Sequence, residues 1–231
     1  MHTDTRSLAP GVRRDPEGRL LEKGIPRRAM VDVARNGVAV VRGALSQPSC
    51  DELVDEAEGA STRYLDLPRR VNGVHQRAEQ LAVRTDDPDL PALGRLISAL
   101  RATMAAQPRW TGLRQFEPTQ ARFMRYRGDA AGLGLHRDGK CYALLVCIFS
   151  LAGTAPFRIV GEDGGPSLDV LVHAGDLVLL RAPGFAGAAD GRPQHAVGAP
   201  LGEHRISLTL RMVRVHPRAA PAPPWSATSH R

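Results

Sequence analysis

From residue 119 onwards, glycine, proline and aspartate divide the sequence into short apolar or alternating segments. Segments of this length that are rich in β-branched and aromatic residues predict β-strands. Eight successive strands of this kind predict a mostly β fold with flanking helices, built on a double-stranded β-helix, the jelly-roll barrel that cupins also have. The predicted strands cover roughly residues 119–126, 133–136, 142–151, 156–161, 167–172, 176–181, 193–197 and 205–213.

The part of the chain before this barrel predicts helices and one further strand. Residues 38–41 are a short β-branched run after an Asn-Gly pair and predict a buried strand. Residues 46–59 begin with serines that can cap a helix and end at glycine, which predicts a helix. Residues 89–104 carry apolar side chains at three- and four-residue spacings and predict an amphipathic helix. Residues 61–88 show no clean periodicity, and we expect them to form a lid.

A chain of 231 residues, 42% of them hydrophobic, is long enough for one sizeable core. We expect a single domain over residues 29–215, in which residues 46–118 supply the lid and the supporting helices and residues 119–213 form the barrel. Residues 1–28 are polar and proline-containing, which predicts a flexible N-terminal arm. The Pro/Ala-rich residues 216–231 predict a disordered tail.

The cellular compartment is indicated by what the sequence lacks. It has no apolar run of about eighteen residues or more, and its first residues carry charges and prolines in place of an apolar signal. Its three cysteines, Cys50, Cys141 and Cys147, are odd in number and show no Cys-x-x-Cys spacing, which argues against a disulfide framework and against a zinc knuckle. We therefore expect a cytoplasmic protein with reduced thiols and no membrane span.

The formal net charge of +7 is carried mostly by the two ends of the chain. Residues 1–30 contain seven basic and four acidic residues, and residues 214–231 contain three basic and no acidic residues. Within the body, residues 95–127 carry seven arginines and the single acid Glu117. This arginine-rich stretch is a candidate contact surface for nucleic acid. The near-neutral remainder of the body suits a small-molecule substrate at least as well.

A His-x-Asp pair, His136 and Asp138, follows the second predicted barrel strand. Residues two apart on a strand point to the same face, so this imidazole and this carboxylate can share a site. A distant third imidazole can complete a two-histidine, one-carboxylate facial triad around Fe(II), which leaves three metal positions open. The pair alone is a weak signal in a chain with eight histidines. Because further strands, a Gly-Asp turn and His195 follow it in order, we predict that His136, Asp138 and His195 bind the metal.

In their order along the chain, these residues resemble the Fe(II)/2-oxoglutarate-dependent oxygenases, and within them the AlkB-like group. The resemblance covers roughly residues 119–213, less than half of the chain. One position departs from the pattern, since Met124 stands where the family usually has asparagine. The matching elements are Arg125-Tyr126 with Gly128, His136-Arg137-Asp138, the strand 144–151 followed by Gly153 and Phe157, Gly175-Asp176, His195, and Arg205 with Arg211.

The resemblance implies an enzyme that uses Fe(II), O2 and the co-substrate 2-oxoglutarate. It implies hydroxylation of a C–H bond, coupled to decarboxylation of 2-oxoglutarate to succinate and CO2. In the family, the first arginine of an Arg-x5-Arg strand binds the C5 carboxylate of 2-oxoglutarate, a role that falls to Arg205, and Tyr126 would offer its hydroxyl to the same end. Arg211 lies on the same face of the predicted strand and would orient the C1 carboxylate or Asp138.

Three functions stay open at this point. The first is oxidative demethylation of alkylated nucleic-acid bases, which requires a flipped base and phosphate-binding arginines. The second is hydroxylation of a small molecule or an amino acid, which requires a lid and a few polar anchors. The third is a cupin-like metal-binding sensor, a non-enzymatic protein that would keep the three metal ligands but would have no use for Arg205.

Overall fold

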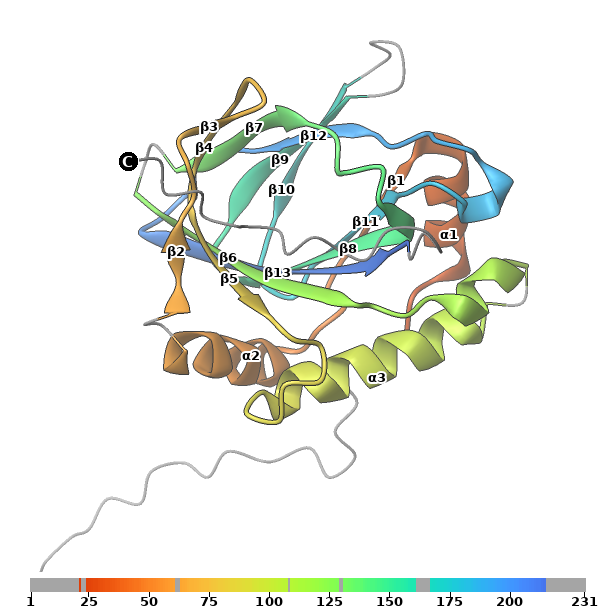
Figure 1. Ribbon diagram of the computed structural model, residues 1–231, viewed down its shortest axis with the longest axis horizontal. Helices are drawn as coiled ribbons and strands as arrows, with labels where there is room; N and C mark the ends of the chain where they lie inside the picture. Colours follow the sequence, from red (N-terminus) through yellow and green to blue (C-terminus); the bar gives the residue numbers. More distant parts are fainter. Residues whose placement is uncertain are drawn as a thin grey trace, which may run out of the picture.

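The computed structural model describes residues 21, 24–60, 63–107, 109–128, 131–160 and 167–214. Their strands form two sheets that lie face to face (Figure 1). The seven-stranded sheet has the order β1-β11-β8-β13-β6-β5-β2, and the six-stranded sheet has the order β10-β9-β12-β7-β4-β3.

The strands of the seven-stranded sheet are β1 (Val38–Val41), β11 (Leu177–Arg181), β8 (Tyr142–Ala152), β13 (His204–Val213), β6 (Gln120–Arg127), β5 (Glu79–Val83) and β2 (Leu65–Asp66). The strands of the six-stranded sheet are β10 (Ser167–Val172), β9 (Ala155–Val160), β12 (Gln194–Val197), β7 (Gly132–His136), β4 (Val74–Arg77) and β3 (Arg70–Val71).

The strands from β6 to β13 alternate between the sheets as in a double-stranded β-helix, except that β9 and β10 form a hairpin within one sheet. Strands β6, β8, β11 and β13 lie in the seven-stranded sheet, and β7, β9, β10 and β12 lie in the six-stranded sheet. Each of these eight strands begins and ends within one residue of the range predicted from the sequence. The predicted fold class is therefore confirmed.

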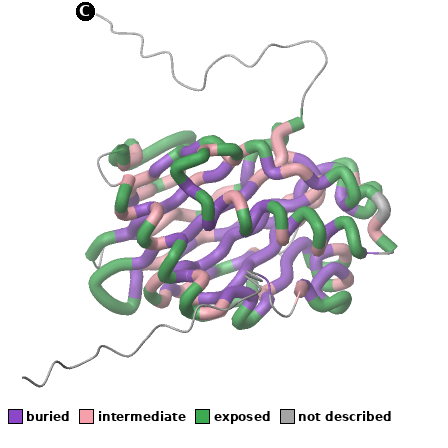
Figure 2. Tube along the Cα trace, turned by 90° about the horizontal axis from the view of Figure 1, so that it is seen from below, coloured by how far each residue is buried: buried purple, intermediate pink, exposed green. Residues whose placement is uncertain are grey.

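Helices cover the face of the seven-stranded sheet that points away from the barrel interior (Figure 1). Both predicted helices are present, as α2 (Gln47–Gly59) and α3 (Pro91–Ala105). They bury apolar side chains such as Leu53 and Leu96 against strand residues such as Phe149. Two short 3-10 helices, η2 (Thr111–Gln115) and η4 (Phe185–Gly187), lie beside this core. Figure 2 shows long runs of buried residues through the middle of the molecule and exposed residues mostly at its periphery.

A third helix, α1 (Arg27–Asn36), was not predicted from the sequence. It begins inside the predicted arm, 1–28, and the residues before it already pack on the core, since Ile25 is only 5% exposed. The helix buries Ala29, Met30 and Val33, and Gly37 ends it in a left-handed conformation, as is usual at helix C-termini. Residues 1–20 of the arm and the predicted tail, 216–231, lie outside the described residues.

The segment that we expected to form a lid, 61–88, contains β2, β3, β4 and β5 over its described part. These strands extend both sheets at one edge of the barrel. Strands β3 and β4 form a hairpin whose turn residues Asn72 and Gly73 have φ values of 50° and 81°. Positive φ at both central residues is typical of a type I′ turn, which Asn-Gly favours. The β3–β4 hairpin is attached to the six-stranded sheet through the β4–β7 pair, and its role as a lid stays a prediction.

The three cysteines are free thiols, of which Cys50 and Cys147 are buried and Cys141 is exposed. Burial raises the pKa of the Cys50 thiol to about 11. Within the described ranges, no helix is both long enough and apolar enough to span a bilayer.

Gly153, in the turn between β8 and β9, is expected to be essential for the stability of the barrel. Its φ is +73°, and a Cβ there would collide with the backbone carbonyl oxygen of His204. Gly43 has a similar φ of +57° but open space around it, so it is a matched control. We expect Gly43→Ala to lower the free energy of unfolding by about 1 kcal/mol through φ strain alone. Gly153→Ala should lower it by about 2–5 kcal/mol because overpacking is added. Urea denaturation measures the free energy of unfolding of both variants. Equal losses would show that the close contact between position 153 and the His204 carbonyl oxygen relaxes without a free-energy cost.

Candidate active site

A cavity of about 710 Å³ lies between the sheets, with the β3–β4 hairpin along one side. All six residues predicted for the site line it, together with further polar residues of the seven-stranded sheet. These lining residues include His136, Asp138, His195, Tyr126, Arg205, Arg211, Arg122, Ser207 and Thr209. A second hollow of about 670 Å³, lined by Arg69, His75 and Arg158 among others, contains none of the six. We therefore assign the candidate active site to the cavity between the sheets.

The two histidines and the aspartate meet on the six-stranded sheet. His136 ends β7 and lies opposite His195 of β12, with the ring centroids 4.2 Å apart. Asp138 follows in the turn after β7, and its Oδ2 lies 3.6 Å from Nε2 of His195. Nδ1 of His136 is 2.8 Å from the carbonyl oxygen of Gly134, and Nδ1 of His195 is 3.5 Å from that of Pro193. Because each Nδ1 can donate its proton to a carbonyl, each Nε2 is left with the lone pair that a metal requires.

Burial and charge set the protonation states of these side chains. Burial alone would raise the pKa of Asp138, but the Arg211 guanidinium, then His195 and His136, outweigh it and lower that pKa. Burial lowers the pKa of His195 to about 4, against the opposing effect of Asp138. At neutral pH the site therefore contains a carboxylate and a neutral imidazole, which are the forms that bind a metal.

The donor set fits a divalent cation such as Fe(II). Oδ1 of Asp138 accepts from Arg211 at 2.8 Å, whereas its Oδ2 is buried and has no hydrogen-bond partner among the described residues. A buried carboxylate oxygen without a partner is costly, and a metal ion would satisfy it. Across the described part of the chain, no three His, Cys, Asp or Glu side chains are already arranged as a metal site. The ligating atoms would therefore have to turn towards a common point when a metal binds.

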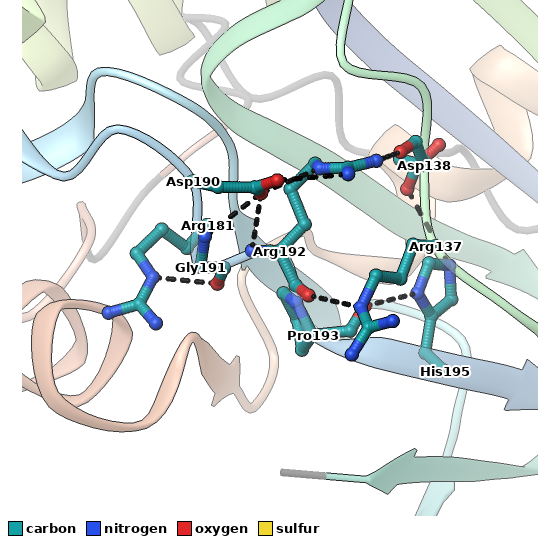
Figure 3. Close-up of polar contacts among 8 residues, drawn as sticks. All are labelled: Arg137, Asp138, Arg181, Asp190, Gly191, Arg192, Pro193 and His195. Atoms are coloured by element: carbon teal, nitrogen blue, oxygen red, sulfur yellow. Dashed lines mark hydrogen bonds and ion pairs between the residues drawn. The ribbon is translucent and has the colours of Figure 1, made fainter. Parts of the chain in front are cut away.

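Residues of the connection between β11 and β12 hold the turn that carries Asp138 in place (Figure 3). Arg192 donates a hydrogen bond from Nη1 to the backbone carbonyl of Asp138. Its other nitrogens donate to both carboxylate oxygens of Asp190, at 2.7 and 3.0 Å, which lowers the pKa of that carboxyl group. Arg137 in turn donates to the carbonyl of Arg192 at 3.1 Å. These contacts fix the backbone of Asp138 independently of its carboxylate.

Arg205 lies in β13 opposite Tyr126 of β6 and is only 1% exposed. Its guanidinium donates to the hydroxyl oxygens of Ser150 at 3.1 Å and Ser207 at 3.3 Å, and lies 5.3 Å from the centre of the Tyr126 ring. Its Nε has no partner, and none of the described carboxylates forms an ion pair with it. Burial lowers the pKa of Arg205, because a charged guanidinium is less stable away from water. A bound anion would offset this desolvation free energy.

Arg211, six residues further along β13, has a different environment. One Nη donates to Gln120 at 3.2 Å and the other pairs with Asp138, while the guanidinium lies 4.8 Å from the ring centre of Tyr142. Its pairing with Asp138 agrees with one of the two roles expected for it. Arg211 is thus neutralised by the protein, and Arg205 is not.

Arg122 was not predicted from the sequence to lie in the site. Arg122, Met124 and Tyr126 are alternate residues of β6, and all three line the cavity. The motif residue Arg125 points to the opposite face, where it pairs with Glu58 and Glu79. The four-residue spacing between Arg122 and Tyr126 places both on one face of a strand, and this signal was available in the sequence.

No family model matches the sequence, and no curated protein matches it. The likeness to solved structures is nevertheless extensive. A prolyl-4-hydroxylase from Pseudomonas putida is 18% identical, with a TM-score of 0.62 over 81% of this chain and 98% of that chain. SnoN, a non-heme α-ketoglutarate-dependent epimerase from nogalamycin biosynthesis, is 15% identical, with a TM-score of 0.58 over 80% of this chain and 81% of that chain.

A third solved structure, OsALKBH1, is 17% identical, with a TM-score of 0.52 over 77% of this chain and 99% of that chain. The chain has the fold of these proteins. Identities this low establish the fold and leave the reaction to be argued from the site.

Proposed function

We propose that this protein is an Fe(II)- and 2-oxoglutarate-dependent dioxygenase that hydroxylates a C–H bond. The observation that carries the proposal is the buried Arg205, which has no carboxylate partner in the described chain and lines the same cavity as His136, Asp138 and His195. One cavity thus combines a metal donor set with an unpaired cation. A dicarboxylate that also carries a ketone complements both, because one end can bind the cation while the other approaches the metal.

The roles of the individual side chains follow from their contacts. His136, Asp138 and His195 would hold Fe(II), which when bound supplies the activation of O2 for oxidation of the substrate. Arg205 would bind the C5 carboxylate of 2-oxoglutarate in a pocket that excludes water, and the Tyr126 hydroxyl would share that carboxylate. Arg211 holds Oδ1 of Asp138 at 2.8 Å, which leaves Oδ2 without a hydrogen-bond partner and available to a metal.

The same observation argues against a metal-binding sensor that lacks a co-substrate. Such a protein would need the metal ligands but would gain nothing from burying an unpaired arginine, which is costly. The solved structures with this fold include a protein described as dependent on α-ketoglutarate, another name for 2-oxoglutarate. Both facts support an enzyme.

Anaerobic titration of the protein with Fe(II) and then 2-oxoglutarate tests the proposal. A visible absorption band should appear only when both are present, and substrate-stimulated release of succinate should follow on admission of O2. Absence of the band, with the protein folded and the metal bound, would contradict it.

Two substrate classes are compatible with this chemistry, and surface charge separates them. The stretch 95–127 was a candidate surface for nucleic acid, but most of its arginines have carboxylate partners. Arg95 pairs with Glu52, Arg101 with Glu117, Arg125 with Glu58 and Glu79, and Arg127 with Glu79. Paired arginines have less charge available for phosphates, so this stretch gives little support to a nucleic-acid substrate.

The salt dependence of substrate binding is expected to be shallow. A protein that contacts six to ten phosphates loses roughly a thousandfold or more in affinity between about 50 and 200 mM salt. A small substrate bound inside the cavity should lose less than about tenfold, because buried charges are screened weakly. The measurement is the KM of the best substrate from a panel of methylated oligonucleotides and small metabolites, at both salt concentrations. A loss of several hundredfold would identify a nucleic-acid substrate.

A further inference from the structure

Arg122 is a second arginine in the cavity that the protein does not neutralise. It lies in the middle of β6, between Thr209 of β13 and Ala82 of β5, and it is partly buried. Its Nε is buried without a hydrogen-bond partner, and no described acid forms an ion pair with it. Burial, followed by repulsion from Arg211, lowers its pKa. Its charge is therefore kept inside the barrel at a cost, as for Arg205.

Among the arginines that line the cavity, Arg122 is partly buried and has no counter-ion assigned to it. Four arginines line the cavity, Arg122, Arg137, Arg205 and Arg211, and Asp138 is the only acid among its described lining residues. Asp138 pairs with Arg211, and Arg137 donates to a backbone carbonyl. The two charges of Fe(II) and the two of 2-oxoglutarate cancel, and the proposed function already assigns Arg205 to the co-substrate. The site as a whole therefore stays positive. Because Arg137 is exposed and Arg205 is assigned to the co-substrate, Arg122 is the partly buried arginine of the described lining to which no anion is yet assigned.

A buried acceptor lies next to Arg122. Gln80 of β5 pairs with Met124 of β6, and Met124 is two residues from Arg122 on the same face of that strand. Gln80 also lines the cavity. Its Oε1 is buried without a hydrogen-bond partner among the described residues. An unpaired cation beside an unpaired acceptor complements a ligand that carries an anionic group and an N–H or O–H donor close together.

We propose that Arg122 binds a carboxylate or phosphate group of a small substrate, so that the oxidised substrate is an anion held inside the barrel. The proposal rests on the proposed function for the assignment of Arg205, and it adds the chemical class of the substrate. Gln80 would accept a hydrogen bond from a donor on the same molecule. One unassigned arginine inside a cavity of about 710 Å³ matches the single anionic group of a small molecule, whereas a nucleic acid presents a chain of phosphates.

The test compares Arg122→Met with Arg127→Met by calorimetry. Arg127 is a matched control because it lies in the same strand but is exposed and pairs with Glu79. Benzoate and phenyl phosphate serve as anionic probes and benzamide as a neutral one of the same shape. Both anions should bind Arg122→Met about 10- to 100-fold more weakly than the wild type, since hydrogen bonds to a charged group are lost. Arg127→Met should bind both anions with wild-type affinity. Benzamide should bind the wild type and both variants with the same affinity.

Thermal unfolding provides a second readout, which separates binding from support of the fold. Methionine replaces a desolvated charge with an apolar chain of similar length, so Arg122→Met should raise the Tm of the metal-free protein by about 2–4 °C. An arginine that supported the fold would lower the Tm when replaced. A lower Tm together with unchanged anion affinity would overturn the proposal.

Two further outcomes would also overturn it. If Arg122→Met loses the absorption band of Fe(II) with 2-oxoglutarate, Arg122 belongs to the co-substrate site. If a single-stranded oligonucleotide binds in an Arg122-dependent way and the small anions do not, the ligand is a phosphodiester chain. The calorimetry is run on metal-free protein as well as on the anaerobic complex. Failure of the proposed function, seen as a missing band in the wild type, is therefore distinguishable from failure of the anion site.

Discussion

The His195→Ala protein is expected to show no turnover of 2-oxoglutarate above that of Fe(II) in buffer. His195 is 3% exposed, its Nε2 faces Asp138, and its ring stacks on Phe157 with the centroids 5.6 Å apart. In the proposed site, removing the imidazole would leave two protein ligands, too few to hold Fe(II) while 2-oxoglutarate competes for the metal. Loss of outer-sphere partners alone costs roughly 10- to 100-fold. Loss of a direct ligand should therefore exceed about 100-fold.

Succinate release and Fe(II) affinity are measured on the same preparation, with His204→Ala as the control. His204 begins β13, is exposed, and does not line the cavity. Its replacement should leave both quantities at wild-type values. Wild-type turnover in purified, folded His195→Ala would remove this histidine from the metal site.

Arg205→Ala is expected to weaken 2-oxoglutarate binding while Fe(II) binding stays nearly intact. Truncating one partner of a buried, hydrogen-bonded charge pair costs about 2–5 kcal/mol, roughly thirty- to several-thousand-fold in affinity. Arg205 meets the conditions for such a loss, because it is 1% exposed and the described chain offers it hydroxyls but no carboxylate. The effect is read from anaerobic titration of the Fe(II)–2-oxoglutarate absorption band.

Arg205→Lys separates charge from shape at the same position. A lysine keeps the positive charge but presents a point cation where arginine presents a planar fork, so it should recover only part of the lost affinity. Arg101→Ala is the control, since Arg101 is exposed and pairs with Glu117 at 2.8 Å. An unchanged affinity in Arg205→Ala would move the carboxylate to another arginine of the cavity, Arg211 or Arg122.

The barrel strands were predictable because their signals are local. Each strand from β6 to β13 is a short run between glycine, proline or aspartate, and such boundaries do not depend on the rest of the fold. Helix α1 was missed for a local reason as well. Its buried face of Ala29, Met30 and Val33 alternates with charged residues as in an amphipathic helix, but its first residues lie in the polar stretch that was interpreted as an arm. The Asn72-Gly73 turn was a readable hairpin signal inside a segment that was interpreted only as a lid.

The spacing of the motif residues and the family resemblance together predicted six site residues that all line one cavity, but they did not show which arginines lack a counter-ion. Arg125 belongs to the motif Arg125-Tyr126, yet it lies outside the barrel and pairs with Glu58 and Glu79. Arg122 has no place in the motif and lies inside. The pleat of β6 separates the two, since residues an odd number apart point to opposite faces.

The sequence by itself determined the order of strands, the His-x-Asp pair with its distant histidine, and the two arginines six residues apart on β13. Only the tertiary structure decided which charges are neutralised. Arg211 meets Asp138, whereas Arg205 and Arg122 meet no acid among the described residues. The partners of Arg211 lie 73 and 91 positions away, at Asp138 and Gln120, and come from the turn after β7 and from β6. Register and sheet packing bring such residues together, and because these are non-local contacts, no pattern within one segment contains them.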